Sequence, residues 1–506
     1  MLITRRVYLI VVLLFISLLE SMGCQRSIVL TVALPISLQL SRENTVYRVN
    51  KDFDLKGAEV VIPKNSTLRF EGGCIKNGVV FGQNTLLDGN IKCYTGIKGS
   101  FKNKFVEIGW FLNRANDISD ILQQITNTNI NEIVISGGIW MVSKTTDLRG
   151  NLMISGKDNP IIEIDRSVVT GPFSVFRISG TVLSFEPVYN YSNITIKDIT
   201  FDENGSNVQG RTTVLYICNA ENVKIQGCKF LEHESDKYAS YVWAALTLYN
   251  CRNCTVQGCY TNYVRLANFG FCVNCTALNN EGYNTPGTWL ESCDGYGIVY
   301  KYNEIYENLF FGNSTISQNS KNGIIKNNTI VVNGKEVDSM INIGHPSNDT
   351  YLNSGDGCIV ENNVVKTETS KGIIVWGSSQ SKDVVIRNND IYSKSKHAIF
   401  VSDAIPSITI KNNRIVGHDE DQVLVLVGAE ESRIQRNTIT TIGSNIHYTP
   451  IRVRRNDNQG RTVIRRNTID NGDNLDKESF IDLDLKECNF EDNKVRGNIS
   501  TRSIRR

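Results

Sequence analysis

A short motif that alternates apolar and polar residues around an asparagine recurs along most of this chain. Examples are IIKNNTI (324–330), IVENNVV (359–365) and VIRNNDI (385–391). The equivalent positions are Asp198, Cys228, Cys259, Asn280, Asn303, Asn328, Asn363, Asn389, Asn413, Asn437, Asn467 and Asn493. Successive positions lie 21 to 35 residues apart, which is about the length of one coil of a parallel β-solenoid.

One copy of this motif cannot bury its apolar face alone, whereas stacked copies cover one another at the spacing of neighbouring strands, about 4.8 Å. Asparagine tolerates the left-handed backbone region, and aligned side-chain amides can form ladders. We therefore predict an all-β solenoid of about 12 or more coils. The composition, with 21% charged and 41% hydrophobic residues, excludes a disordered polymer, and a net charge of +2 gives no reason to expect nucleic-acid binding.

The first residues are typical of an export signal. Arg5 and Arg6 precede an apolar run at 7–19, which is shorter than the roughly 20 residues that a membrane-spanning helix needs. Residues 1–24 are therefore predicted to be a signal peptide. The segment resembles a bacterial lipoprotein cleavage box with Cys24 as the lipidated residue, although Ser21 stands where leucine is usual. Ordinary secretion and a retained membrane anchor are the alternatives. In each case we expect export, to the cell surface, the outer membrane or the periplasm.

The repeat resembles the right-handed parallel β-helix proteins of the pectate lyase superfamily, most strongly over residues 190–497. Residues 47–165, with VVIPKNSTLRFEGG, VEIGWF and the helix-like DISDILQQITN, resemble the amino-terminal cap of secreted β-helix proteins of gut Bacteroidetes. We predict a tether at 25–46, a cap with a short helix and the first coils at 47–189, the main β-helix at 190–497 and a basic tail at 498–506. Apolar residues at 118, 121, 122 and 125 have the period of a helix.

Four cysteines have the spacing of a metal site, but the repeat gives a simpler explanation for that spacing. Cys251, Cys254, Cys272 and Cys275 read as two CxxC pairs with seventeen residues between them, which is a spacing that zinc sites use. Each cysteine is also 21 residues from its counterpart, which matches the local coil length, so the thiols could instead stack as small buried residues. A disulfide is the third alternative.

In the superfamily that the chain resembles, ligands lie across the strand that precedes the asparagine motif. Alternation along these strands predicts one set of inward residues: Leu246, Leu248, Leu290, Ile341, Ile343, Ile373, Val375, Ile399, Val401, Ile451, Val453, Ile481 and Leu483. The predicted outward set includes Tyr249, Trp289, Glu291, Asn342, Trp376, Asp403, Arg452, Arg454, Asp482 and Asp484, with His345 directly after its strand. We expect the functional site on this outward face.

Trp289, Trp376 and Asp403 are candidates for binding substrate on this face. The tryptophans could stack on the apolar C–H surfaces of sugars, or pack beneath loops. Arg452 and Arg454 could neutralise an anionic sugar, or pair with acidic residues one coil further along.

Elimination from a uronic-acid polymer requires a group that neutralises the carboxylate, a base for the C5 proton and a proton donor. The chain offers these three groups without a metal: Asn342 as the neutraliser, His345 as the base and either Tyr249 or Tyr296 as the acid. A calcium-dependent mechanism is the alternative. Glu291, with Asp294, could serve a hydrolase as a carboxylate pair, although Asp294 before a glycine suits a turn.

The resemblance implies a secreted polysaccharide lyase that acts on an acidic polysaccharide such as a glycosaminoglycan or pectin. A β-helix glycoside hydrolase, an epimerase and a non-catalytic carbohydrate-binding or tailspike-like protein remain alternatives, since one fold supports several chemistries. We expect a monomer whose partner is the polysaccharide.

Overall fold

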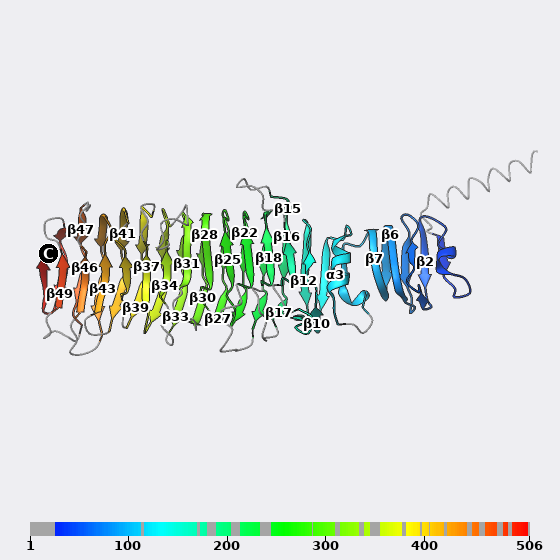
Figure 1. Ribbon diagram of the computed structural model, residues 1–506, viewed down its shortest axis with the longest axis horizontal. Helices are drawn as coiled ribbons and strands as arrows, with labels where there is room; N and C mark the ends of the chain where they lie inside the picture. Colours follow the sequence, from blue (N-terminus) through cyan, green and yellow to red (C-terminus); the bar gives the residue numbers. More distant parts are fainter. Residues whose placement is uncertain are drawn as a thin grey trace, which may run out of the picture. The chain divides into compact units, whose positions relative to one another are not determined.

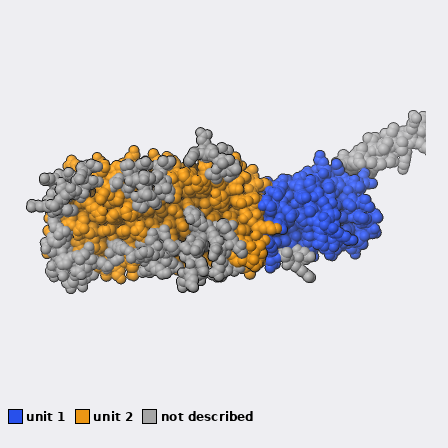
Figure 2. Space-filling view, viewed as in Figure 1, with its two compact units in different colours: residues 1–136 blue, residues 137–506 orange. Residues whose placement is uncertain are grey.

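The computed structural model describes most of the chain. It covers residues 26–112, 116–169, 173–179, 189–203, 213–232, 244–285, 287–308, 314–332, 338–344, 355–376, 381–394, 397–403, 405–418, 422–442, 448–454, 461–472, 479–483 and 488–503. The predicted signal peptide with Cys24, and also His345 and Asp484, lie outside these ranges. The chain divides into two compact units, residues 1–136 and 137–506 (Figure 2). Within the described ranges, none of the helices is both long and apolar enough to span a bilayer.

The first unit is built on a parallel sheet. Its strand order is β1 (Arg26–Val29), β2 (Thr45–Val49), β5 (Thr67–Phe70), β6 (Ile75–Gly89) and β3 (Phe53–Asp54). Both β4 (Glu59–Val61) and β7 (Cys93–Phe101) also pair with β6. Strand β8 (Phe105–Glu107) pairs with β9 (Glu132–Ser136), and short helical turns form α2 (Ile36–Gln39) and η1 (Ile108–Trp110). The segment that we expected to be a tether therefore holds β1 and α2.

The short helix of the predicted cap is α3 (Ser119–Thr126). Its apolar positions Ile118, Ile121, Leu122 and Ile125 are all buried, as the helical period predicts. The Gln124 side chain accepts a hydrogen bond from a backbone N–H of β7 at 3.0 Å, so the helix is tied to the edge of a strand.

The second unit is a parallel β-helix with three long sheets (Figure 1). Within this unit, the described strands of the first sheet run from β12 (Leu152–Lys157) to β50 (Cys488–Glu491), and the second sheet has 14 described strands from β10 (Ile139–Val142) to β51 (Lys494–Arg496). The third, also of 14 described strands, runs from β11 (Thr146–Asp147) to β52 (Ile499–Ser503). Most of the expected basic tail is therefore a strand of this sheet.

The third sheet carries the face on which we expected the site. Between its end strands, its order is β14 (Phe176–Ile178), β18 (Leu215–Cys218), β22 (Leu246–Tyr249), β25 (Ala267–Gly270), β28 (Leu290–Tyr296), β31 (Ser314–Lys321), β34 (Ser339–Ile343), β37 (Lys371–Val375), β40 (Ile399–Val401), β43 (Gln422–Val427), β46 (Tyr448–Val453) and β49 (Ser479–Leu483). All thirteen residues predicted to point inward are buried, at no more than 1% exposure. The prediction for the inward set is therefore confirmed. The outward half of the alternation is wrong for Trp289, Asn342 and Asp482, which are buried as well.

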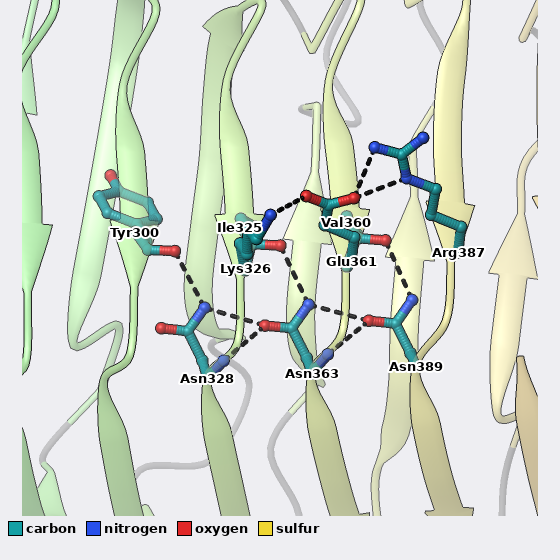
Figure 3. A network of polar contacts seen from close by, with 9 residues as sticks. All are labelled: Tyr300, Ile325, Lys326, Asn328, Val360, Glu361, Asn363, Arg387 and Asn389. Carbon is teal, nitrogen blue, oxygen red and sulfur yellow. Dashed lines mark hydrogen bonds and ion pairs between the residues drawn. The ribbon is translucent and has the colours of Figure 1, made fainter.

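A ladder of buried asparagines lies at the corner between the first and second sheets. Asn280, Asn303, Asn328, Asn363, Asn389, Asn413, Asn437 and Asn467 are each no more than 1% exposed. In each step, the side-chain oxygen of one asparagine accepts two hydrogen bonds from the asparagine one coil before it. One comes from the backbone N–H and the other from the side-chain amide, as from Asn328 to Asn363 (Figure 3). Each amide also donates to a backbone carbonyl of the preceding coil, such as that of Ile325 for Asn363. Stacking therefore satisfies the amide's oxygen and nitrogen in a buried site.

The left-handed residue of this corner is the one before the ladder position, contrary to our prediction for the asparagine itself. Asn362 has φ 56° and Asn327 φ 54°, and even Tyr302 adopts φ 54° at the same place. The ladder position instead uses the asparagine side chain as both a hydrogen-bond donor and an acceptor. Asp198 is a second correction: the register pairs Ile196 with Ile225 and Thr200 with Lys229, so Asp198, with φ 58°, is the left-handed residue and the buried Ile199 takes the ladder position.

Candidate functional site

Successive strands of the third sheet place one residue each in a continuous row, on the side that alternation assigns outward. The register aligns Glu291, Ser317, Asn342, Ile374, Phe400, Leu426, Arg452 and Asp482. Of these, Ser317, Asn342, Ile374, Leu426 and Asp482 are no more than 7% exposed. The neighbouring outward position follows the strand ends and includes Trp376 and Arg454, whose backbone N–H groups bond to the preceding coil. Side chains from strands far apart in the sequence therefore meet on this face because the coils stack in register.

Aromatic and cationic side chains gather around Phe400 on β40. The Trp376 ring lies 5.4 Å from the Phe400 ring and is tilted by 58°, and the His397 ring stacks on Phe400 at 5.6 Å and 28°. The Arg454 guanidinium carbon lies 5.5 Å from the centre of the Phe400 ring, and Lys371 Nζ lies 5.9 Å from it. We call Trp376, His397, Phe400, Lys371 and Arg454 the Phe400 cluster. Its three rings are half-buried, so part of each remains open to solvent.

Each cation of this region has a carboxylate partner, but the pairs differ. Lys371 Nζ lies 3.2 Å from Asp338 Oδ1. Arg454 is 3.7 Å from the exposed carboxylate of Asp403, which is a long contact in water and is therefore weak. Asp403 projects over Gly428, where any Cβ would clash with its carboxylate. Arg454 is thus held near the rings by a contact that an anionic ligand can replace.

Arg452 makes a much tighter ion pair than Arg454. Its Nη2 and Nε atoms lie 2.7 and 2.8 Å from one oxygen of Asp482, and Asp482 is only 2% exposed. Of the two alternatives for Arg452, pairing with Asp482 one coil on is therefore the one that the structure shows. Arg452 is held by a buried carboxylate, so a ligand would have to compete with this pair.

His397 lies beside the cluster with one ring nitrogen engaged. Its Nδ1 is 2.6 Å from the carbonyl oxygen of Val423, so this nitrogen carries the hydrogen and donates it. Burial is the largest cause that lowers the pKa of His397, and the charges of Lys371, Arg454 and Arg452 lower it further. The ring is therefore neutral at neutral pH, with Nε2 as its basic nitrogen.

Trp289 does not face solvent, so its predicted role as an exposed sugar platform is wrong. The side chain is fully buried, its Nε1 donates to Thr261 Oγ1 at 2.7 Å, and its ring fills the space that a side chain at Gly282 would need. Trp289 directly precedes β28, where the chain leaves a corner and the alternation of a regular strand has not yet begun. It is a core residue that spans from the third sheet to the second.

Asn342 is also buried, at 7% exposure, contrary to the prediction that it faces solvent. Its amide donates to the carbonyl of Gly344 at 3.0 Å and to Ser317 Oγ at 3.4 Å. An amide committed in this way is poorly placed to neutralise a substrate carboxylate. His345, the predicted base, lies outside the described residues, so its role stays a prediction.

The other predicted catalytic residues lie on different strands from the Phe400 cluster. Tyr249 is on β22, five strands from β37, or about 24 Å at the usual strand spacing. Burial raises the pKa of Tyr249, and its ring contacts Phe271 at 5.2 Å. Tyr296, on β28 and 47% exposed, accepts a hydrogen bond from Asn322 at 3.1 Å.

Glu291 is held in an ion pair on β28. Its Oε2 atom lies 2.8 Å from Arg265 Nη2, and Arg265 also donates to the carbonyl of Thr288 at 2.6 Å. Asp294 has φ 51° inside β28, where the register with β31 shifts between Cys293 and Tyr296, so it lies at a strand irregularity and not in the turn that the alternative interpretation expected. These contacts do not bring the two carboxylates into the Phe400 cluster.

The four cysteines with CxxC spacing stack in adjacent coils. The register places Cys254 above Cys275 and Cys251 above Cys272, and all four are at most 1% exposed. The thiols point to backbone carbonyls, as Cys272 does to Leu248 at 3.3 Å. None of these four cysteines forms a disulfide. Among the described residues, no group of three or more His, Cys, Asp or Glu side chains is arranged to hold a metal ion.

Sequence reasoning missed His397, Phe400 and Lys371 as site residues. The alternation does place Phe400 outward, between the inward Ile399 and Val401, so its signal was present. His397 and Lys371 precede or begin their strands, where alternation gives no direction. Their meeting depends on the register between β37 and β40, which pairs Ile373 with Ile399 and hence Lys371 with His397.

Comparisons with known proteins agree on the fold. The sequence matches two family models, described as "Periplasmic copper-binding protein (NosD)" over residues 221–420 and "Right handed beta helix region" over residues 350–503. The chain is a right-handed parallel β-helix. No curated protein matches it.

Several solved structures are similar at low sequence identity. A mutant tailspike protein of E. coli bacteriophage HK620, in complex with a pentasaccharide, has a TM-score of 0.51 at 13% identity, with 78% of each chain covered. The A-module of mannuronan C-5 epimerase AlgE6 from Azotobacter vinelandii has a TM-score of 0.43 at 16% identity, covering 79% of this chain and 99% of that one. The catalytic domain of a GH87 alpha-1,3-glucanase in complex with nigerose has a TM-score of 0.46 at 14% identity, covering 79% and 68%.

Proposed function

We propose that this protein is an exported enzyme that cleaves a uronic-acid-containing polysaccharide by β-elimination. The observation that carries the proposal is the Phe400 cluster, in which half-buried aromatic rings and a weakly held arginine share one outward face. Aromatic rings bind the apolar faces of sugars, and guanidinium groups bind carboxylates with two parallel hydrogen bonds.

Arg454 takes the role of carboxylate neutraliser that the sequence had suggested for Asn342. Its contact with Asp403 is long and solvent-exposed, so replacing that partner by a uronate costs little. Trp376 and Phe400 would hold the sugar ring beside it. The tailspike protein of similar fold was solved with a bound pentasaccharide, which supports a carbohydrate ligand for a scaffold of this shape.

Export is part of the proposal. Its supports are the basic residues and apolar run before Cys24, and the match to a family model described as periplasmic. Lipidation at Cys24 would place the protein on a membrane surface. Mass spectrometry of the mature amino terminus tests this, since a free amino terminus at any other residue contradicts lipidation.

The activity is tested by incubating the full chain with glycosaminoglycan and pectic polymers, with and without a chelator. Only elimination forms an unsaturated uronide, which absorbs in the ultraviolet. Rising absorbance together with new reducing ends supports the proposal. New reducing ends without absorbance would show hydrolysis, and polymer binding without either would show a binding protein; both results contradict the lyase.

A matched pair of variants ties the activity to the site. Trp376→Ala should weaken polymer binding by roughly tenfold, the value of about 1–2 kcal/mol for one stacking contact. Tyr392→Ala removes a half-buried aromatic residue from the second sheet, on β39 (Asp390–Ser393), and should leave binding unchanged. Equal effects of the two substitutions would place the binding site elsewhere.

A further inference from the structure

His397 is fixed in a defined tautomer and orientation by two separate contacts. Its Nδ1–H donates to the Val423 carbonyl at 2.6 Å, and its ring stacks on Phe400. The contact with Val423 runs between adjacent coils, because the register pairs Ile399 with Val425 and therefore His397 with Val423. A backbone acceptor on Nδ1 leaves Nε2 with its lone pair, which is the arrangement that holds a histidine ready to accept a proton.

The charges around His397 favour its neutral form. Lys371 lies one coil before it and Arg454 lies against the same Phe400 ring, while Arg452 adds a third positive charge. Their carboxylate partners are Asp338 for Lys371, Asp403 for Arg454 and Asp482 for Arg452. A cationic imidazolium beside three cations would be unfavourable, so the ring is uncharged in the absence of substrate.

The same positive charges suit the intermediate of an elimination. Removing the C5 proton of a uronate puts negative charge on its carboxylate, and guanidinium and ammonium groups stabilise such charge. The carboxylate also offsets the repulsion that a protonated His397 would feel from its neighbours. The candidate base, His397, and the candidate neutraliser, Arg454, therefore both contact the ring of Phe400.

We propose that His397 is the general base of the Phe400 cluster and takes the C5 proton of a uronate whose carboxylate is bound by Arg454. This step rests on the proposed function. The C5–H bond breaks and its proton passes to Nε2, while the electron pair delocalises onto the carboxylate that Arg454 binds. The pair then forms the double bond between C4 and C5 as the bond from C4 to the glycosidic oxygen breaks, and that oxygen takes a proton from water. The imidazolium returns its proton to water, so no cofactor or oxidant is consumed.

The test uses His397→Asn, because the asparagine amide can still donate to the Val423 carbonyl while Nε2 is lost. His418→Asn is the matched control, since His418 is the other described histidine and is also half-buried, at the end of a different sheet's strand. Elimination is followed by ultraviolet absorbance on the polymer that the wild-type protein cleaves, and affinity for the same polymer is measured in parallel.

We expect His397→Asn to lose at least about 100-fold in kcat, the usual contribution of a general base, with polymer affinity and thermal stability unchanged. In the wild-type protein, kcat/KM should rise with pH through the lowered pKa of His397 and level off at neutral pH. His418→Asn should match the wild type in both measurements.

Three results would overturn the assignment. Elimination at the wild-type rate in His397→Asn excludes His397 as the base while leaving the lyase function standing. Nitrogen NMR of the histidine ring that shows hydrogen on Nε2, or a positive charge at pH 7, excludes it without any substrate. If the wild-type protein shows no elimination on any uronic-acid polymer, the proposed function falls and this role falls with it.

Discussion

The side-chain oxygen of Asn363 accepts two hydrogen bonds from Asn328, one from its backbone N–H and one from its side-chain amide, both at 2.9 Å. Asn363 in turn donates to the Ile325 carbonyl at 3.0 Å and to Asn389 at 2.9 Å (Figure 3). One buried side chain therefore connects three consecutive coils. The same pattern continues through the ladder, so the corner is stabilised by neighbours rather than by any single coil.

Removing one step of the ladder should be costly. Asn363→Leu leaves both donors of Asn328 and the carbonyl of Ile325 without their partners inside the protein, and each such loss costs about 1–3 kcal/mol. We expect a total loss of about 3–6 kcal/mol, seen as a lower melting temperature in calorimetry. Asn362→Gly is the control: Asn362 is exposed with φ 56°, which glycine adopts freely, so its melting temperature should be unchanged. Equal shifts for both variants would contradict the ladder's role.

The ion pairs of Glu361 should make stability fall in acid. Glu361 is 7% exposed and lies 2.7 Å from Lys326 and 2.6 Å from Arg387, and its hydrogen bond with Lys326 is the largest cause that lowers its pKa (Figure 3). A lowered pKa contributes stability above about pH 4.5 and loses it as the pH falls further, because the unfolded chain then binds the proton first. Glu361→Gln should therefore be about 1–2 kcal/mol less stable at pH 7 and approach the wild type below pH 4. A constant difference in melting temperature across this range would be the contrary result.

Arg452, on β46, and Arg454, directly after that strand, should respond differently to substitution. Arg452→Ala leaves the carboxylate of Asp482 buried without its guanidinium partner, and we expect a loss of about 3 kcal/mol in stability. Arg454→Ala removes the long, exposed contact with Asp403 and the contact with the Phe400 ring, so we expect stability to change by less than about 1 kcal/mol while polymer affinity falls. Calorimetry and binding measurements on both variants check this. Reversal of the two effects would assign the ligand contact to Arg452.

A buried carboxyl outside the Phe400 cluster should destabilise the fold as the pH rises. Glu203 is 1% exposed, and burial, followed by the charge of Glu232, raises its pKa well above the ordinary value. The folded protein therefore keeps a proton that the unfolded chain releases above about pH 4.5, so stability falls with increasing pH.

Glu203→Gln removes this titration and should gain in melting temperature over the wild type between pH 5 and pH 8. Glu163→Gln, at a half-buried position on β13 (Ile161–Ile164), is the control and should not change the pH dependence. Parallel melting curves of Glu203→Gln and the wild type across this range would show that Glu203 is ionised in the fold.

Much of the architecture was readable from the sequence because it repeats. The spacing of the asparagines gave the coil length, and the period of two gave the inward residues from Leu246 to Leu483, all of which are buried. The amphipathic period likewise found α3. The same reasoning was wrong at corners, where a strand ends and alternation no longer applies: Trp289 was predicted to face solvent and is buried, and the left-handed residue is the one before the ladder asparagine. It was also wrong within β34 and β49, where Asn342 and Asp482 were predicted to face solvent and are buried.

By itself, the sequence determined a stack of coils and which side of each strand is apolar, since both follow from local periodicity. Only the tertiary structure decided which outward side chains meet. Arg452 pairs with Asp482, and His397 joins Phe400, Trp376 and Arg454, because the register between coils of unequal length brings them together. Such contacts depend on how many residues each loop inserts between two strands. A local sequence pattern does not contain this information, so it cannot predict which residues of the next strand lie beside a given side chain.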